Sequence, residues 1–422
     1  EFLIETLDSG ELHSLSLQTT LTGDDFEAMR REEGLRPESL AVQFDIRNAR
    51  FRPHPDLPPL EEAHVAGFVG GREIDISDAY ADMVMADGRR LALTDVSFTK
   101  DDYWDAQERA ALGLRLRGGA DALASLLNTP LVGAAGVEEL DPESLFGNVS
   151  LDVALSISFD ADPGDDQSPV AVTGSLSGIA LPGVFAGEDL GEGNFQVTYR
   201  NGNLDLAGEA RLGGDRVELH LTQRPDAPVN VEISTILDAA ARARRGMRLG
   251  NGLTGDLPLV IRTVLDPDGP QDLQIEANLT PTRIDGLVPG LSKPSGQAGS
   301  LSFILREGDG WLLDAISLES GATRISGSLA LDREGQVLSG TFDRLQLSSG
   351  DDARATLRRE NGVLRIDLRA ATLDARPFVA DFEIASGDTG GEDLDLDLRA
   401  DAGQRPLQID ADVVRQRLQG RH

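Results

Sequence analysis

The chain contains no cysteine, which excludes structural disulfides, zinc–thiolate centres and thiol nucleophiles. Lysine occurs only at Lys100 and Lys293, so arginine carries nearly all of the positive charge. Aromatic residues make up 5% of the chain, with Trp104 and Trp311 as the only tryptophans, so there is no aromatic platform for stacking bases or sugars. No apolar run approaches the roughly 20 residues of a membrane-spanning helix, and no signal peptide is visible.

Basic residues are also scarce relative to acidic ones. The chain has 39 lysines and arginines against 72 aspartates and glutamates, so its formal net charge is −33 over 422 residues. This balance argues against nucleic acid as a partner and against broad adhesion to anionic membrane surfaces. The length is enough to bury a large core and, taken alone, would fit two or three domains.

Signatures of catalysis and of cofactor binding are also missing. The five histidines are scattered, and neither an H-E-x-x-H pair, a G-x-S-x-G elbow, a P-loop nor a dinucleotide fingerprint occurs. The stretch Asp160–Asp166 has a faint likeness to a calcium loop, but it lacks the EF-hand order and the closing glutamate. We therefore predict no enzyme, no catalytic residue, no metal site and no cofactor.

What the sequence does contain is a period of two. In Val149–Phe159, apolar residues alternate with serine, aspartate and alanine, which indicates a strand with one apolar and one wet face. The stretch Gly202–Thr222 repeats this pattern on both sides of Gly213-Gly214. A two-residue turn at these glycines would pair Leu206 with Leu221 and Ala210 with Val217. Any loop of even length keeps apolar residues opposite apolar ones, so the pattern predicts a hairpin without fixing its turn.

Helical patterns are few and short. They occur near residues 23–33, 120–128 and 235–245, and no low-complexity linker divides the chain. We divide the sequence into an N-terminal part, residues 1–225, and a C-terminal part, residues 226–422, which together form one continuous β-structure.

Alternating strands leave two architectures open. Two sheets could press their apolar faces together as a closed sandwich or barrel. Alternatively, hairpins that follow one another along the chain could form a long meander that curls into an open trough. Periodicity alone gives the same apolar-in, polar-out pattern for both.

A family resemblance favours the trough. The second half carries Lys293-Pro294-Ser295-Gly296 after a proline–glycine turn, a G-S-L-x-L-D-x-x-G hairpin at residues 327–335, and an L-D-x-R-P element at residues 373–377. These motifs resemble the AsmA-like superfamily, most closely its YhdP-type members, which are related to the TamB branch and to bridge-like lipid transfer proteins. The first half resembles the family's repeated strands less specifically.

The resemblance implies an all-β fold with a few short helices, namely an elongated, curled antiparallel meander that forms a U-shaped open trough with a hydrophobic interior. It implies a Gram-negative protein that is anchored in the inner membrane, extends through the periplasm, and moves phospholipids passively along its groove to the outer membrane. We expect the anchoring helix to lie outside this sequence. The expected partners are phospholipids, the inner membrane, and outer-membrane or periplasmic proteins.

The candidate groove-lining residues are the apolar members of the alternating strands. They are Val149, Leu151, Val153, Leu155, Ile157, Leu204, Leu206, Leu219, Leu221, Phe303, Leu329, Leu331, Leu394 and Leu396. The competing hypothesis is a scaffold with a closed β-sandwich core, which assists outer-membrane protein assembly through exposed strand edges.

Overall fold

A computed structural model describes residues 7–31, 33–129, 140–158, 169–185, 187–225, 227–245, 247, 252–265, 272–286, 290–373 and 394–400. The chain divides into two compact units, residues 1–229 and residues 230–422.

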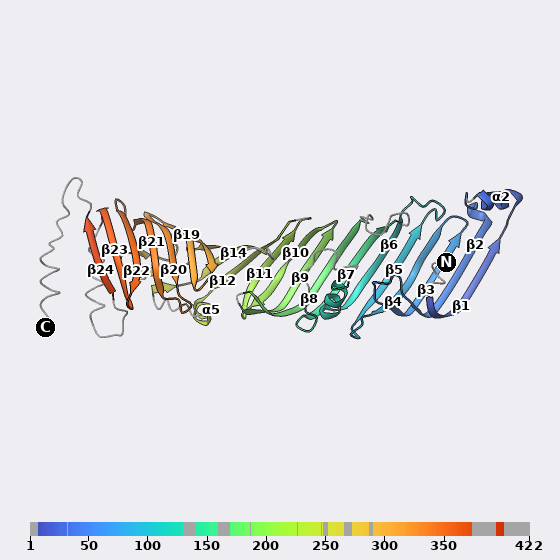
Figure 1. The fold of residues 1–422 in the computed structure, drawn as a ribbon, viewed down its shortest axis with the longest axis horizontal. Coiled ribbons are helices and arrows are strands. Elements are labelled where there is room, and N and C mark those ends of the chain that lie inside the picture. The colour runs from blue at the N-terminus through green and yellow to red at the C-terminus, as the bar shows by residue number, and fades with distance from the viewer. Residues whose placement is uncertain are drawn as a thin grey trace. The chain divides into compact units, whose positions relative to one another are not determined.

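The first unit is an antiparallel meander in which each strand pairs with the next one along the chain (Figure 1). Its strands are β1 (Leu7–Thr19), β2 (Leu40–Phe51), β3 (Leu60–Gly70), β4 (Ile74–Val84), β5 (Arg90–Lys100), β6 (Ala110–Gly119), β7 (Phe146–Ile157), β8 (Val170–Phe185), β9 (Glu188–Arg200), β10 (Asn203–Leu212) and β11 (Asp215–Gln223). Within the described residues β1 pairs with β2 alone, so this sheet does not close on itself.

The hairpin of β10 and β11 has the register that a two-residue turn at its glycines would give. Leu206 lies opposite Leu221 and Ala210 opposite Val217, and the loop consists of Gly213 and Gly214 alone. These glycines have φ values of 57° and 89°, and a two-residue turn with two positive φ angles follows the right-handed twist of the flanking strands. The predicted hairpin is therefore confirmed.

The described part of the first unit contains two short helices and one helical turn: α2 (Gly23–Arg31), η1 (Pro37–Ser39) and α3 (Ala120–Leu127). The carboxylate of Asp25 holds the segment between β1 and β2 together. It accepts hydrogen bonds from the Thr22 backbone N–H at 2.7 Å, from Arg36 Nη2 at 2.7 Å and from Ser39 Oγ at 2.8 Å. The alanine-rich α3 packs instead on β5, β6 and β7.

The second unit contains a larger and a smaller sheet. The strands of the larger sheet are β12 (Val229–Leu237), β14 (Leu257–Leu265), β15 (Leu273–Asn278), β18 (Gly299–Glu307), β19 (Trp311–Ser320), β20 (Thr323–Leu331), β21 (Val337–Gln346), β22 (Asp352–Glu360), β23 (Val363–Thr372) and β24 (Leu394–Ala400). From β14 to β23 successive members pair antiparallel, whereas β24 pairs parallel to β23. The smaller sheet consists of β13 (Leu253–Thr254), β16 (Arg283–Asp285) and β17 (Ser292–Lys293).

The helix α5 (Ala239–Arg244) begins later than the alanine- and arginine-rich pattern from residue 235 indicates. The residues Thr235–Leu237 remain in β12, because Thr235 and the neighbouring Ile236 are β-branched and suit a strand. Asp238 caps the helix, since its side chain accepts a hydrogen bond from the Ala241 N–H at 2.7 Å.

Both units therefore consist mainly of antiparallel strands in an open sheet, which confirms the predicted all-β meander. A closed sandwich, the other architecture that periodicity allows, is not formed by the described strands of either unit. The smaller sheet and the parallel β24 are features that the sequence pattern did not predict.

Glycines let neighbouring strands approach closely at particular points. Gly208 lies opposite Phe195, and a Cβ added to Gly208 would stand 2.0 Å from the Asn194 carbonyl oxygen. Glycine also lies directly opposite phenylalanine at Gly67 and Phe44, and at Gly327 and Phe342. A phenylalanine beside a glycine supplies the apolar cover that the missing side chain leaves out.

Both lysines of the chain are buried. Lys100 is 5% exposed, and its ammonium group donates to the carbonyl oxygens of Asp105, at 2.9 Å, and Glu108. Lys293 is 1% exposed, and its Nζ donates to the carbonyl oxygens of Thr282 at 2.8 Å and Pro294 at 3.2 Å. Each lysine thus holds a loop against its sheet through backbone carbonyl groups.

Candidate functional site

The register of the first unit aligns apolar residues into rows that cross the strands. We call the longest of these row 1, and every member lies opposite the next in a neighbouring strand. Row 1 consists of Phe51, Leu60, Met83, Leu91, Gly118, Val149, Leu176, Phe195, Gly208 and Leu219. It crosses all strands from β2 to β11 without a polar side chain.

A second row lies two residues further along each strand. Row 2 consists of Ala81, Leu93, Leu116, Leu151, Gly174, Val197, Leu206 and Leu221, and it crosses β4 to β11. Residues two apart in a strand point to the same side of a sheet, so rows 1 and 2 share one face.

The candidates Val153 and Leu204 lie in a third row, and Leu155 in a fourth. Ile157 lies opposite Ala110 on the same face. All nine candidates of the first unit therefore lie on one face, which we call the apolar face of this unit.

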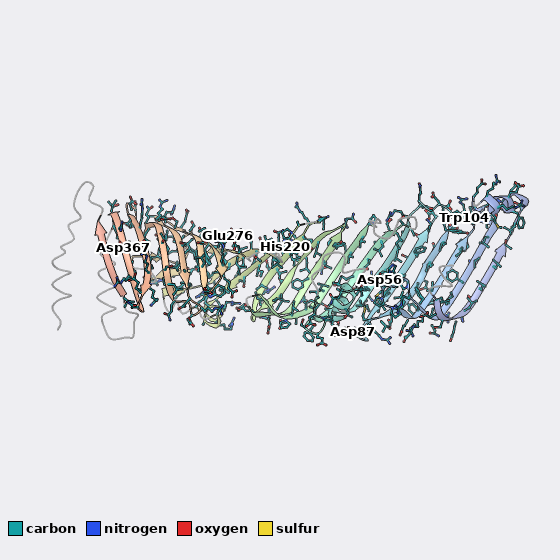
Figure 2. All side chains as sticks on the ribbon, viewed as in Figure 1. Asp56, Asp87, Trp104, His220, Glu276 and Asp367 are labelled. Atoms are coloured by element: carbon teal, nitrogen blue, oxygen red, sulfur yellow. The ribbon has the colours of Figure 1, made fainter. Side chains whose placement is uncertain are left out.

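The opposite face is charged. Arg115 forms ion pairs with Asp152 at 2.7 Å and with Asp95 at 2.9 Å, and the side-chain hydrogen bond from Arg115 to Asp152 raises the pKa of the arginine. His220, labelled in Figure 2, lies 3.0 Å from Asp205 through Nε2. These polar pairs keep one side of the sheet in water, so apolar contacts are left to the other side.

Burial varies along the apolar face. Val149 and Leu151 are only 4% and 6% exposed, in the region of β5, β6 and β7 on which α3 packs. The remaining candidates of this unit are half-buried: Val153, Leu155, Ile157, Leu204, Leu206, Leu219 and Leu221. A second sheet packed on this face would have buried them fully, so they keep apolar surface available to a ligand.

The second unit also has apolar rows, and one of them is covered. Row 3 consists of Leu259, Ala277, Leu301, Leu318, Ile325, Leu345, Ala353 and Ala370. Four residues from the smaller sheet and its connections join the same hydrophobic cluster, namely Leu253, Leu279, Ile284 and Leu291. The smaller sheet therefore acts as a cover over row 3.

A second row of the larger sheet, which runs alongside row 3, is only partly buried. Row 4 consists of Leu273, Leu305, Leu313, Leu329, Gly340, Leu357 and Ile366, and its leucines and Ile366 are half-buried. The candidate Leu329 belongs to it, while Phe303 lies opposite Ile275, and Leu331 opposite Trp311. The backbones of Leu394 and Leu396 pair with Leu364 and Ile366, but their side chains fall outside what the structure describes.

Several members of the rows could not be predicted from the alternation of apolar residues in the sequence. Gly118, Gly174 and Gly208 complete rows 1 and 2, although a glycine carries no hydropathy signal. The cover in the second unit was also missed, because its strands are two or three residues long and too short to show a period. Lys293, which the sequence shows only as one of two lysines and as part of a resemblance, is the buried anchor of this cover.

Other predicted features lie partly or wholly outside the described residues. The stretch Asp160–Asp166 does so completely, as does the L-D-x-R-P element after Leu373. Within the ranges that the structure covers, no group of three or more histidine, aspartate or glutamate side chains could hold a metal ion. No helix in those ranges is long and apolar enough to span a membrane.

Comparison with known proteins adds no assignment. No protein-family model, curated protein or solved structure matches this chain.

Proposed function

We propose that this chain binds the acyl chains of lipids on its apolar faces and forms a segment of a passive lipid conduit. The observation that supports this proposal best is row 1, in which ten successive partners are apolar or glycine. Five of its members are buried, while Leu176, Gly208 and Leu219 stay half-buried, so the row offers apolar surface to a ligand mainly from β8 to β11.

Length is a second argument. Nine spacings of roughly 4.8 Å between neighbouring strands make row 1 about 43 Å long. This is longer than the hydrocarbon core of a bilayer, which is about 30 Å thick. An acyl chain that lies along the half-buried part of this face, at β8 to β11, keeps its methylene groups out of water, and transfer of each of them to water costs about 0.8 kcal/mol.

The chemistry of the face indicates weak specificity. Aliphatic side chains and glycine make no directional bonds, so acyl chains of different lengths should bind similarly. The charged opposite face suits a segment that stands in water. Together with the resemblance to the AsmA-like superfamily, these features support phospholipids as the ligands and the periplasm between the inner and outer membranes of a Gram-negative envelope as the location.

Site-specific photo-crosslinking tests the proposal. A photoreactive amino acid at Leu155 would face the apolar side of β7, and the same residue at Ala154 would face the opposite side. We expect lipid adducts, identified by mass spectrometry, at position 155 and not at position 154. Protein purified without co-bound lipid, together with equal or absent labelling at both positions, would refute lipid binding on this face.

A further inference from the structure

Exposed apolar side chains are concentrated in one part of the described chain. Seven of the sixteen large hydrophobic residues that are exposed lie between Leu7 and Met29, and four of them are leucines of β1. All thirteen residues of β1 are exposed, whereas most residues of the interior strands β3 and β7 are buried or half-buried.

The exposed leucines of β1 extend the apolar face. Leu17 lies opposite Val42 and Leu15 opposite Phe44, and Leu12 lies opposite Ile46 after a bulge at His13. Their exposed fractions are 62%, 57% and 58%, respectively. The bulge brings Leu12 onto the same side as the other two, so three leucines stand on one face, and among the described residues their strand partners lie in β2 alone.

The backbone of β1 is suited to pairing on its second edge. The run Ser14–Thr19 keeps an unbroken register with β2, and alternate residues of an antiparallel edge strand direct their N–H and C=O groups away from the sheet. Proteins commonly protect such edges with lysine or proline, and β1 contains neither.

The charged side chains of β1 indicate which kind of strand could pair with its second edge. The charged side chains of β1 at neutral pH are Asp8 and Glu11, and both are acidic. On the occupied edge, β2 places Arg47 opposite Glu11 and Arg50 within 3.8 Å of Asp8. A strand on the second edge meets the same carboxylates, so basic residues on its polar side complement them.

We propose that β1 accepts an extended strand from a polypeptide partner, with alternate residues apolar and the polar side basic. The added strand continues both the backbone ladder and the apolar face of the first unit. A second copy of this chain fits less well, because it carries a net charge of −33 and its own β1 is acidic. The same charge disfavours an anionic bilayer surface. Strand addition requires no bound lipid, so it stands or falls independently of the conduit.

The sequence of β2 supplies a probe with the required chemistry. A fluorescently labelled peptide with the sequence of residues 40–51 (LAVQFDIRNARF) is titrated with the chain, and binding is followed by anisotropy. We expect saturable binding at one peptide per chain. The double substitution Leu15→Asn and Leu17→Asn should weaken it at least tenfold, and a peptide with proline in place of Phe44 should not bind.

Matched controls distinguish specific peptide binding at the edge of β1 from nonspecific binding to exposed apolar side chains. Leu338 in β21 is also exposed, at 44%, so Leu338→Asn should leave peptide binding unchanged. Circular dichroism and Trp104 fluorescence should show that the β1 variant keeps its fold.

Three results would overturn the proposal. The first is the absence of peptide binding, or equal binding by the β1 variant. The second is a dimer of the chain that the β1 substitutions dissociate, since it would assign the edge to a second copy. The third is flotation with phosphatidylethanolamine–phosphatidylglycerol vesicles that is lost on the same substitutions without peptide binding, which would assign the leucines to a bilayer.

Discussion

Replacing Leu206 with aspartate places a carboxylate in the middle of row 2, between Val197 and Leu221. A carboxylate keeps its hydration shell, so an acyl chain cannot stay in contact with the row at this point. If about two or three methylene groups lose their apolar contact, binding becomes less favourable by about 1.6–2.4 kcal/mol, at about 0.8 kcal/mol for each group. We therefore expect a roughly 15- to 50-fold weaker affinity for an acyl chain on this face.

The neighbouring residue provides the control. Ala207 lies on the polar face, opposite Gln196 and His220, so Ala207→Asp adds the same charge to the same strand one residue away. Titration of a pyrene-labelled fatty acid measures both affinities, and the urea midpoint of each variant monitors folding. Equal losses in the two variants, or no loss in either, would show that the face named here does not hold the acyl chain.

Three further substitutions test the fold around this site. Gly208→Ala should lower the urea midpoint of the first unit, read by Trp104 fluorescence in a Trp311→Phe background, because its Cβ would stand 2.0 Å from the Asn194 carbonyl oxygen; an unchanged midpoint would contradict the close approach. Hydrogen bonds from Arg36 and Thr22 lower the pKa of Asp25, so its stabilising effect is present above its unfolded pKa of about 3.9 and is lost as the pH falls further. Asp25→Asn should therefore reduce the loss of stability below about pH 4. An equal loss of stability below about pH 4 in the variant and in the unchanged protein would refute this role. Burial lowers the pKa of Lys293, so the second unit should gain stability as the pH rises through the lowered pKa toward the ordinary value near 10.4, and Lys293→Met should flatten this alkaline rise in urea titrations that Trp311 reports.

The sequence was sufficient where the signal is local. The alternation of Gly202–Thr222 and its two glycines indicate a hairpin without outside information, and the structure adds the two-residue turn that places Leu206 opposite Leu221. The candidates of each strand of the first unit lie on one face because they were chosen from strict alternation, whereas the pairing of the strands brings all nine onto the same face. Successive side chains of any strand point to opposite faces, so this alternation does not depend on which elements pack against the strand.

The rest depends on contacts between distant segments. No local pattern shows that Gly118 will stand between Leu91 and Val149, because strand pairing decides this. The cover of the second unit combines Leu253 with Ile284, which are joined by a pairing between strands of two and three residues. Burial of Lys293 is likewise invisible in the sequence, since lysine usually indicates an exposed position.

The burial of Lys100 and Lys293 has a consequence for the chemistry of the whole surface. Since the chain has no other lysine, its folded surface offers amine-reactive reagents almost no target beyond the terminal amino group. Crosslinkers of the succinimidyl type would therefore miss a partner even when one is bound, and carboxylate- or light-activated reagents are needed in their place. Conversely, acylation of Lys293 would report the moment at which the smaller sheet of the second unit lifts away, so this lysine is a built-in probe of local opening.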